Sequence, residues 1–199
     1  MNKDLIEEHR RINVEYDWWD SVYDTFQQIC EIIGINLNTD EPKSTGFWSQ
    51  GDGASFTGYY RAYALDLNTR ADHNYYETAP AKIREYAPED EELHRIADEL
   101  CMLSRVYFPI HISIARLGRS SYVHEQTMDC YVDPMEGDPD NWDEEVHAYV
   151  QEQGTLLMRD LARWLYRTLE KEYDYLTSDE VVWESIQANE LCETHNDKE

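Results

Sequence analysis

The sequence predicts an α+β fold in which helices pack on a four-stranded antiparallel sheet built from two β-hairpins. Residues 43–63 contain a Gly-Asp-Gly turn between two short segments, and residues 109–133 begin with alternating apolar and polar side chains. Both features are typical of hairpins. Residues 16–33 and 88–106 instead carry apolar side chains at steps of three and four, which indicates helices. We therefore expect the order α-ββ-α-ββ-α-α.

The first helix is expected from Tyr16 to Ile33. Gly34 is expected to end it, because glycine readily adopts the backbone conformation that closes a helix. Residues 1–13 are polar and are expected to form a loose helix or an arm. The apolar positions that define the helix share one face: Trp19, Val22, Tyr23, Phe26, Ile29, Cys30 and Ile33.

The first hairpin is expected to have strands 43–49 and 54–63. They would be joined through Gln50-Gly51-Asp52-Gly53, a composition suited to tight hairpin turns. With Gly51-Asp52 as the turn, Phe47 would lie opposite Phe56, and Trp48 opposite Ser55.

Residues 64–77 are expected to form an irregular loop. Thr78 is expected to cap a short helix that ends at Tyr86, and Pro88 to stand in the first turn of a longer one. The second hairpin would pair strands 109–117 and 122–133.

The last third is expected to be helical. Asn141 would cap a helix that runs to about Tyr173 with a break near Gly154. Thr177-Ser178-Asp179-Glu180 fits a capping box and would open a final helix that ends near Asn189. We expect one domain over residues 1–190 and a disordered acidic tail over 191–199.

Charge is the least usual property of the chain. Its 199 residues include 42 acidic and 17 basic ones, for a net charge of −25. Residues 129–199 carry 20 acidic against 5 basic residues, so the negative charge is concentrated towards the C-terminus. Such a field repels nucleic acid and anionic lipid and attracts basic surfaces. Direct binding to nucleic acid is therefore not expected, because it needs clustered lysine and arginine.

Cysteine usage and hydropathy argue for reduced thiols in a cytoplasm. Cys30, Cys101, Cys130 and Cys192 form no Cys-x-x-Cys pair and match no zinc spacing. No stretch reaches the length of about 18 apolar residues that a membrane span requires. The first eleven residues are charged and lack the apolar region of a signal peptide.

The segment 47–56, with the letters FWSQGDGASF, resembles a family of uncharacterised phage and prophage proteins that share a WSQGDGA block. Residues 16–20, 82–97 and 169–190, the last containing LEKEYDYLTSDE, resemble the same family in the same order. Some members carry an antitoxin label. The resemblance implies a phage-encoded protein that acts in the cytoplasm of a bacterial host, and it implies no particular chemistry.

Two interpretations of the Gln50-Gly51-Asp52-Gly53 turn stay open. Trp48, Gln50 and Asp52 could grip a ligand at its tip, or the glycines could merely supply the backbone angles of a tight turn. The turn has neither the glycine spacing nor the lysine of a phosphate-binding loop.

The histidines do not predict a metal site. With Leu117 paired to Tyr122, His124 would face Ala115 and His111 would face Met128. The two imidazoles would then stand about 13 Å apart along the strand, which is too far for a shared ion. No nucleophile motif is present, and among 42 carboxylates no pair stands out as catalytic. We therefore expect no metal and no cofactor, and the residues favour a binding role over an enzymatic one.

Acidic residues at helical spacing are candidates for a binding surface. Carboxylates three or four residues apart on a helix lie about 5–6 Å apart, comparable to phosphates along a DNA strand. They could imitate a nucleic acid, or they could only keep the protein soluble. The candidate rows are Asp17, Asp20, Asp24 and Glu31, and Asp138, Asp140, Asp143, Glu144 and Glu145.

Three functional hypotheses follow. The first is a phage-encoded acidic protein that inhibits or modulates a host factor with a basic surface, with mimicry of a nucleic acid as the sharper version. The second is a small-ligand binder or small enzyme with a site on the sheet near Gln50, Asp52, His111 and His124. The third is an antitoxin-like partner of a toxin.

Overall fold

A computed structural model describes residues 2–66, 71–106, 111–116, 123–132 and 143–191. The chain forms two compact units, one of residues 25–166 and one of residues 1–24 with 167–199. The expectation of a single domain over 1–190 stays a prediction, and most of the expected tail lies outside the described residues.

The larger unit contains a four-stranded antiparallel sheet, as the sequence predicts, but it is not built from the two predicted hairpins, because β2 (Lys43–Ser44) and β3 (Ala54–Ser55) form a separate two-stranded sheet. Its strands are β1 (Ile35–Leu37), β4 (Gly58–Arg61), β7 (His111–Arg116) and β8 (Met128–Val132), and they pair in the order β1-β4-β7-β8. The α+β class is therefore confirmed. The edge strand β1, directly after the first long helix, is one that the sequence did not predict.

The first hairpin is shorter than expected, and its predicted register is wrong. β2 (Lys43–Ser44) pairs with β3 (Ala54–Ser55), and Lys43 rather than Trp48 lies opposite Ser55. Residues 45–53 form a wide loop instead of continuing the strands. Phe56 does not meet Phe47, because its fully buried ring packs in the core against Phe26, with ring centroids 5.3 Å apart.

The stretch expected to be irregular is also ordered. β5 (Tyr63–Asp66) and β6 (Ala71–Asn74) form a two-stranded antiparallel ribbon. Helix α3 (Tyr75–Tyr86) then begins before Thr78, because the Asn74 side chain accepts a hydrogen bond from the Glu77 amide and caps the helix there. Helix α4 (Glu91–Val106) begins after Pro88, where Asp90 accepts from the Leu93 amide.

The register predicted for the second hairpin is wrong as well. Ala115 lies opposite Asp129 rather than His124, and Met128 lies opposite Arg116 rather than His111. The cause is a short 3₁₀ helix, η1 (Glu125–Thr127), which delays the start of β8. His124 caps this turn through its ring nitrogen.

The predicted end of the first long helix and the predicted start of the last helix are confirmed, whereas the predicted start of the first and the break near Gly154 are wrong. Helix α2 (Asp20–Ile33) starts later than Tyr16 but ends at Gly34, whose φ is +100°. Helix α5 (Glu144–Leu176) is continuous through Gly154, where a break was expected. Helix α6 (Asp179–Ala188) begins within the predicted segment 177–180, and its cap is Ser178, which accepts from the Val181 amide. Asn141 lies outside the described residues.

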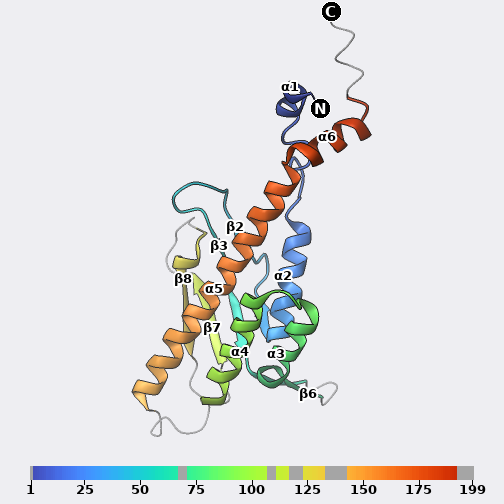
Figure 1. The fold of residues 1–199 in the computed structure, drawn as a ribbon. Coiled ribbons are helices and arrows are strands. Elements are labelled where there is room, and N and C mark those ends of the chain that lie inside the picture. The colour runs from blue at the N-terminus through green and yellow to red at the C-terminus, as the bar shows by residue number, and fades with distance from the viewer. Residues whose placement is uncertain (1, 67–70, 107–110, 117–122, 133–142, 192–199) are drawn as a thin grey trace, which may run out of the picture. The chain divides into compact units, whose positions relative to one another are not determined.

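One face of the sheet forms the core of the larger unit. Its buried side chains are Ile35, Tyr60, Ile112, Ile114, Cys130 and Val132. Helix α5 crosses this face so closely that a methyl group added to Gly154 would stand 2.9 Å from Ile112 Cδ1. Figure 1 shows β7 and β8 behind α5. Helix α4 contributes Ser104, whose buried hydroxyl lies 2.9 Å from that of Tyr60.

The smaller unit gives the N-terminal residues a defined place. Helix α1 (Lys3–Glu8) packs on α6 through a buried apolar cluster of Leu5, Ile6, Val182 and Ile186. Arg10 pairs with Asp179 at 2.5 Å. The N-terminal segment is thus a docked helix rather than a loose arm. Within the described residues, no helix has the length and apolar character to cross a membrane.

Candidate functional site

The WSQGDG loop, residues 45–53, is closed by its own polar groups. At its base, the Thr45 amide donates to the Gly53 carbonyl at 3.0 Å, and the Thr45 hydroxyl accepts from the Gly53 amide at 2.9 Å. Near its tip, the Asp52 carboxylate accepts from the Ser49 amide at 2.8 Å. Asp52 therefore has a structural role, because it replaces the strand pairing that this segment lacks.

Aromatic side chains attach the loop to helix α5. The Phe47 ring lies 5.6 Å from the ring of Tyr166, and also 5.6 Å from that of Trp48. Trp48 has a φ of +69° and is 68% exposed, and Gln50 is also exposed. Positive φ is uncommon for a bulky side chain, so the loop holds Trp48 outward at a conformational cost.

The other end of the loop contacts η1. A methyl group built on Gly53 would stand 2.9 Å from His124 Cδ2 and 3.1 Å from its Cα. His124 Nδ1 lies 3.0 Å from the Gln126 amide and 3.0 Å from Glu125 Oε2. The backbone of the loop and the imidazole are thus packed without space between them.

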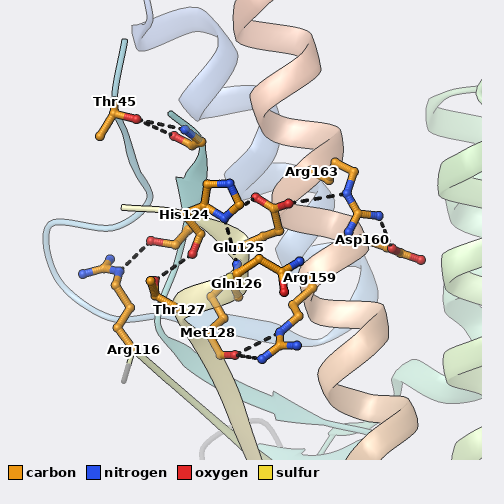
Figure 2. A network of polar contacts seen from close by, with 12 residues as sticks. Thr45, Arg116, His124, Glu125, Gln126, Thr127, Met128, Arg159, Asp160 and Arg163 are labelled. Atoms are coloured by element: carbon orange, nitrogen blue, oxygen red, sulfur yellow. Dashed lines mark hydrogen bonds and ion pairs between the residues drawn. The ribbon is translucent and has the colours of Figure 1, made fainter. Parts of the chain in front are cut away.

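Charged groups extend from η1 across α5 to α4, and Figure 2 shows the part from Glu125 to Asp160. Glu125, whose side chain is 13% exposed, lies 3.7 Å from Arg163, which pairs with Asp160 at 2.7 Å. Asp160 in turn pairs with Arg95 of α4 at 2.6 Å. Neighbouring charges of opposite sign attract one another, so this row of ion pairs holds η1, α5 and α4 together.

A second group of contacts lies beside the hairpin β2-β3. Arg116 donates from Nε to the buried Ser55 hydroxyl at 2.7 Å and pairs with Glu41, whose side chain is only 4% exposed. Arg159 donates twice to the Met128 carbonyl, at 3.0 and 2.7 Å (Figure 2). These contacts are all satisfied within the protein, which is typical of structural rather than catalytic groups.

The histidines and cysteines of the described residues lie apart from one another or in the core. No cluster of three or more histidines, cysteines or carboxylates among them could hold a metal ion. His111 begins β7, whereas His124 lies beyond the opposite end of that strand. Burial raises the pKa of the Cys30 and Cys130 thiols, so both stay protonated and unreactive at neutral pH.

The first acidic row is divided between the two units. Asp17, Asp20 and Asp24 are exposed in the smaller unit, with Asp17 just before α2. Glu31 is exposed in the larger unit and accepts a hydrogen bond from Gln27 at 3.0 Å. The smaller unit therefore holds three of the four candidates close together in sequence.

The second acidic row has a local structural purpose. Asp143 caps α5 by accepting from the Glu145 amide at 3.0 Å. Glu144 and Glu145 stand in the first turn of the helix, where the dipole favours negative charge. Asp138 and Asp140 lie outside the described residues.

Two surface pockets lie away from the WSQGDG loop. One, of about 310 Å³, lies between α4 and α5 and is lined by Met102, Tyr149 and Leu157 among others. The other, of about 230 Å³, lies at the end of α2 and is lined by Glu31, Asn36 and Arg61 among others.

Sequence reasoning missed the arginine network, because its partners are distant along the chain. Arg116 and Glu41 are separated by 75 residues, and Arg95 and Asp160 by 65. Only the spacing of Asp160 and Arg163, three residues apart on one helix, could have been read as an ion pair.

Comparison with known proteins gives a family and no activity. A family model described as a domain of unknown function, DUF8835, matches residues 18–179. No curated protein and no solved structure matches the chain. The match includes the WSQGDG loop, the whole sheet and the charged network.

Proposed function

The chain belongs to the DUF8835 family of domains of unknown function, and we propose that it acts as an acidic protein that binds a positively charged surface of a partner. The observation that supports this proposal is that its positive and negative side chains have different surroundings. At least half of the ten arginines that the structure describes pair with carboxylates of the same chain, while carboxylates such as those of Asp17, Asp20 and Asp24 are exposed.

In the part of the chain that the structure describes, five arginines form ion pairs with carboxylates of the same chain. They are Arg10, Arg84, Arg95, Arg116 and Arg163. A cation beside an anion contributes little to the long-range field. The field that a distant partner meets is therefore dominated by the surplus of carboxylates, which gives the net charge of −25.

Asp17, Asp20 and Asp24 are the most favourable contact residues. All three are exposed, and none forms an ion pair with another described residue. Asp20 and Asp24 are four residues apart on α2, so their carboxylates project from the same side of the helix. In the group at 143–145, two residues stand in the first turn of a helix, where the helix dipole favours negative charge. Of the three aspartates only Asp20 stands in such a turn, so the dipole does not account for Asp17 and Asp24.

The sharper form of the proposal is imitation of a nucleic acid. The partner would be a host nucleic-acid-binding or defence protein, and this protein would occupy its basic groove. The resemblance of the WSQGDGA block to phage and prophage proteins supports a bacterial host as the place of action. An antitoxin-like role differs only in the partner, which would then be a toxin without a nucleic-acid site.

The test is capture of partners from a bacterial host lysate on the immobilised protein. Bound proteins are identified after elution with increasing salt and, separately, after elution with a short DNA duplex. The proposal expects DNA-binding proteins that the duplex displaces and that leave the column as salt screens the charges. Recovery of no such protein at low salt would contradict the mimic, and recovery of one toxin indifferent to DNA would favour the antitoxin form.

A further inference from the structure

The four-stranded sheet has a second face, opposite the core, that is open to solvent. Side chains alternate between the two faces along every strand, so the residues next to the buried ones point outward. We call the outward group the open sheet face. It consists of Asn36, Tyr59, Arg61, His111, Ser113 and Tyr131.

Two tyrosines on this face flank a small side chain. Tyr59 lies opposite Ser113, and Ser113 lies opposite Tyr131, so the three form one row across neighbouring strands. Because strands are about 4.8 Å apart, the two tyrosines start about 10 Å apart with only Ser113 between them. Tyr59 is 48% and Tyr131 is 45% exposed. Exposed aromatics beside a small residue provide a stacking surface for a planar ring.

The charge on this face differs from that of the whole protein. Arg61 is exposed, lies directly opposite His111, and forms no ion pair with any described residue. A single described carboxylate, Asp129, shares the outward side of these strands, and it accepts a hydrogen bond from the Cys130 amide at 3.0 Å.

A hollow adjoins the row at its edge strand. The pocket of about 230 Å³ at the end of α2 is lined by Asn36 and Arg61, which also belong to the open sheet face, and by Glu31 among others. Arg61 follows Tyr59 by two residues on β4, which places it about 7 Å along the same side of the strand. A ring on the tyrosines would thus bring an attached anion close to Arg61.

We propose that the open sheet face binds a nucleoside monophosphate. The base stacks over Ser113 between Tyr59 and Tyr131, and the phosphate meets the Arg61 guanidinium and the His111 imidazole. Guanidinium groups bind phosphate by paired hydrogen bonds, and nucleobases stack on tyrosine with little regard to sequence. This proposal rests on the sheet register and is independent of the acidic surface.

The overall charge selects a mononucleotide over a polymer. Each added phosphate increases repulsion from a protein of net charge −25, while only one arginine faces the site. A single nucleotide therefore gains the local contacts and suffers the least repulsion.

The test is titration of isotope-labelled full-length protein with AMP, followed through its backbone amide resonances. Adenosine, ribose 5-phosphate and a ten-nucleotide single-stranded oligo-dA are titrated in parallel. We expect AMP to shift the resonances of β4, β7 and β8, and adenosine and ribose 5-phosphate each to bind at least about ten-fold more weakly. The oligonucleotide should bind more weakly than AMP.

Variants locate the site. Tyr59→Ala and Arg61→Gln should each weaken AMP binding about ten-fold or more, whereas Tyr149→Ala, at an exposed tyrosine of α5, should leave it unchanged. Unchanged melting temperatures would show that the exposed substitutions leave the fold intact. The proposal is overturned if AMP shifts no resonance on these strands, if Tyr59→Ala binds AMP as well as the parent, or if oligo-dA binds more tightly than AMP. None of these results bears on partner capture by the acidic surface.

Discussion

The α-carbon of Gly53 faces the imidazole of His124 so closely that an added methyl group would stand 2.9 Å from the ring. This contact joins the WSQGDG loop to η1, and through Glu125 and Arg163 to helix α5. The loop is therefore packed against η1, and Gly53 is required because a larger side chain would not fit beside His124.

Gly53→Ala should destabilise the protein. The new methyl would press on the ring and backbone of His124, and overpacking of this kind costs about 1–3 kcal/mol. Urea unfolding of parent and variant measures the difference. Gly46→Ala in the same loop is the control, since its methyl would meet nothing closer than 3.9 Å. Equal stability of the two variants would show that the loop does not rest on His124.

Removal of Arg116 should be more damaging than removal of its partner. Arg116→Met leaves the Glu41 carboxylate buried, 3.9 Å from Lys43 as its remaining cation, and should cost about 3 kcal/mol. Glu41→Gln keeps a hydrogen-bonding side chain and should cost less, about 1–2 kcal/mol. Chemical denaturation of both single variants and the double variant gives the coupling energy. A coupling near zero would mean that the pair contributes no specific contact.

The sequence was sufficient for the elements whose cause is local. The start of α6 within residues 177–180 and the end of α2 at Gly34 depend on residues within a few positions, so the pattern alone located both. The alternation of apolar and polar side chains in β7 could also be predicted from the sequence, because one face of the strand is buried.

Strand registers could not be predicted from local sequence patterns. The start of β8 depends on the turn at His124, and the end of β2 depends on Thr45, which bonds to Gly53 instead of extending the strand. Such choices depend on side-chain hydrogen bonds that compete with strand pairing. The open sheet face emerged only when the true register placed Tyr59, Ser113 and Tyr131 in one row.

Gly154 should tolerate only a small side chain. A methyl would meet just the terminal Cδ1 of Ile112, which can move, and alanine favours a helix by about 1 kcal/mol over glycine. Gly154→Ala should therefore be nearly neutral, and Gly154→Leu should cost more than about 2 kcal/mol by forcing α5 from the sheet. Thermal and urea unfolding check both. A Leu variant as stable as the Ala variant would show that α5 does not lie closely on β7.

Stability should fall at alkaline pH. Burial raises the pKa of the Cys130 thiol to about 12, above its value in the unfolded chain. As pH rises past 9, the unfolded state loses this proton and the native state keeps it. The free energy of unfolding therefore falls by up to about 1.4 kcal/mol per pH unit for this group.

Cys130→Ala should reduce that slope by about 1 kcal/mol per pH unit between pH 9 and 10. Val132→Ala on the same strand is the matched control, because it creates a cavity without removing a titrating group. The readout is urea unfolding at several pH values. Identical slopes in the two variants would assign the alkaline loss to other groups.

The central claim, that exposed carboxylates bind a cationic partner, is tested most directly by neutralising them. Asp17→Asn, Asp20→Asn and Asp24→Asn are combined in one variant, and Glu85→Gln, Glu89→Gln and Glu184→Gln in a control with the same net charge. The dissociation constant for a captured partner is measured at low and high salt. We expect the aspartate variant to bind about ten-fold or more weakly at low salt, the control to bind nearly as the parent does, and the difference to shrink as salt screens the charges. Equal affinity of the two variants at every salt concentration would contradict the account.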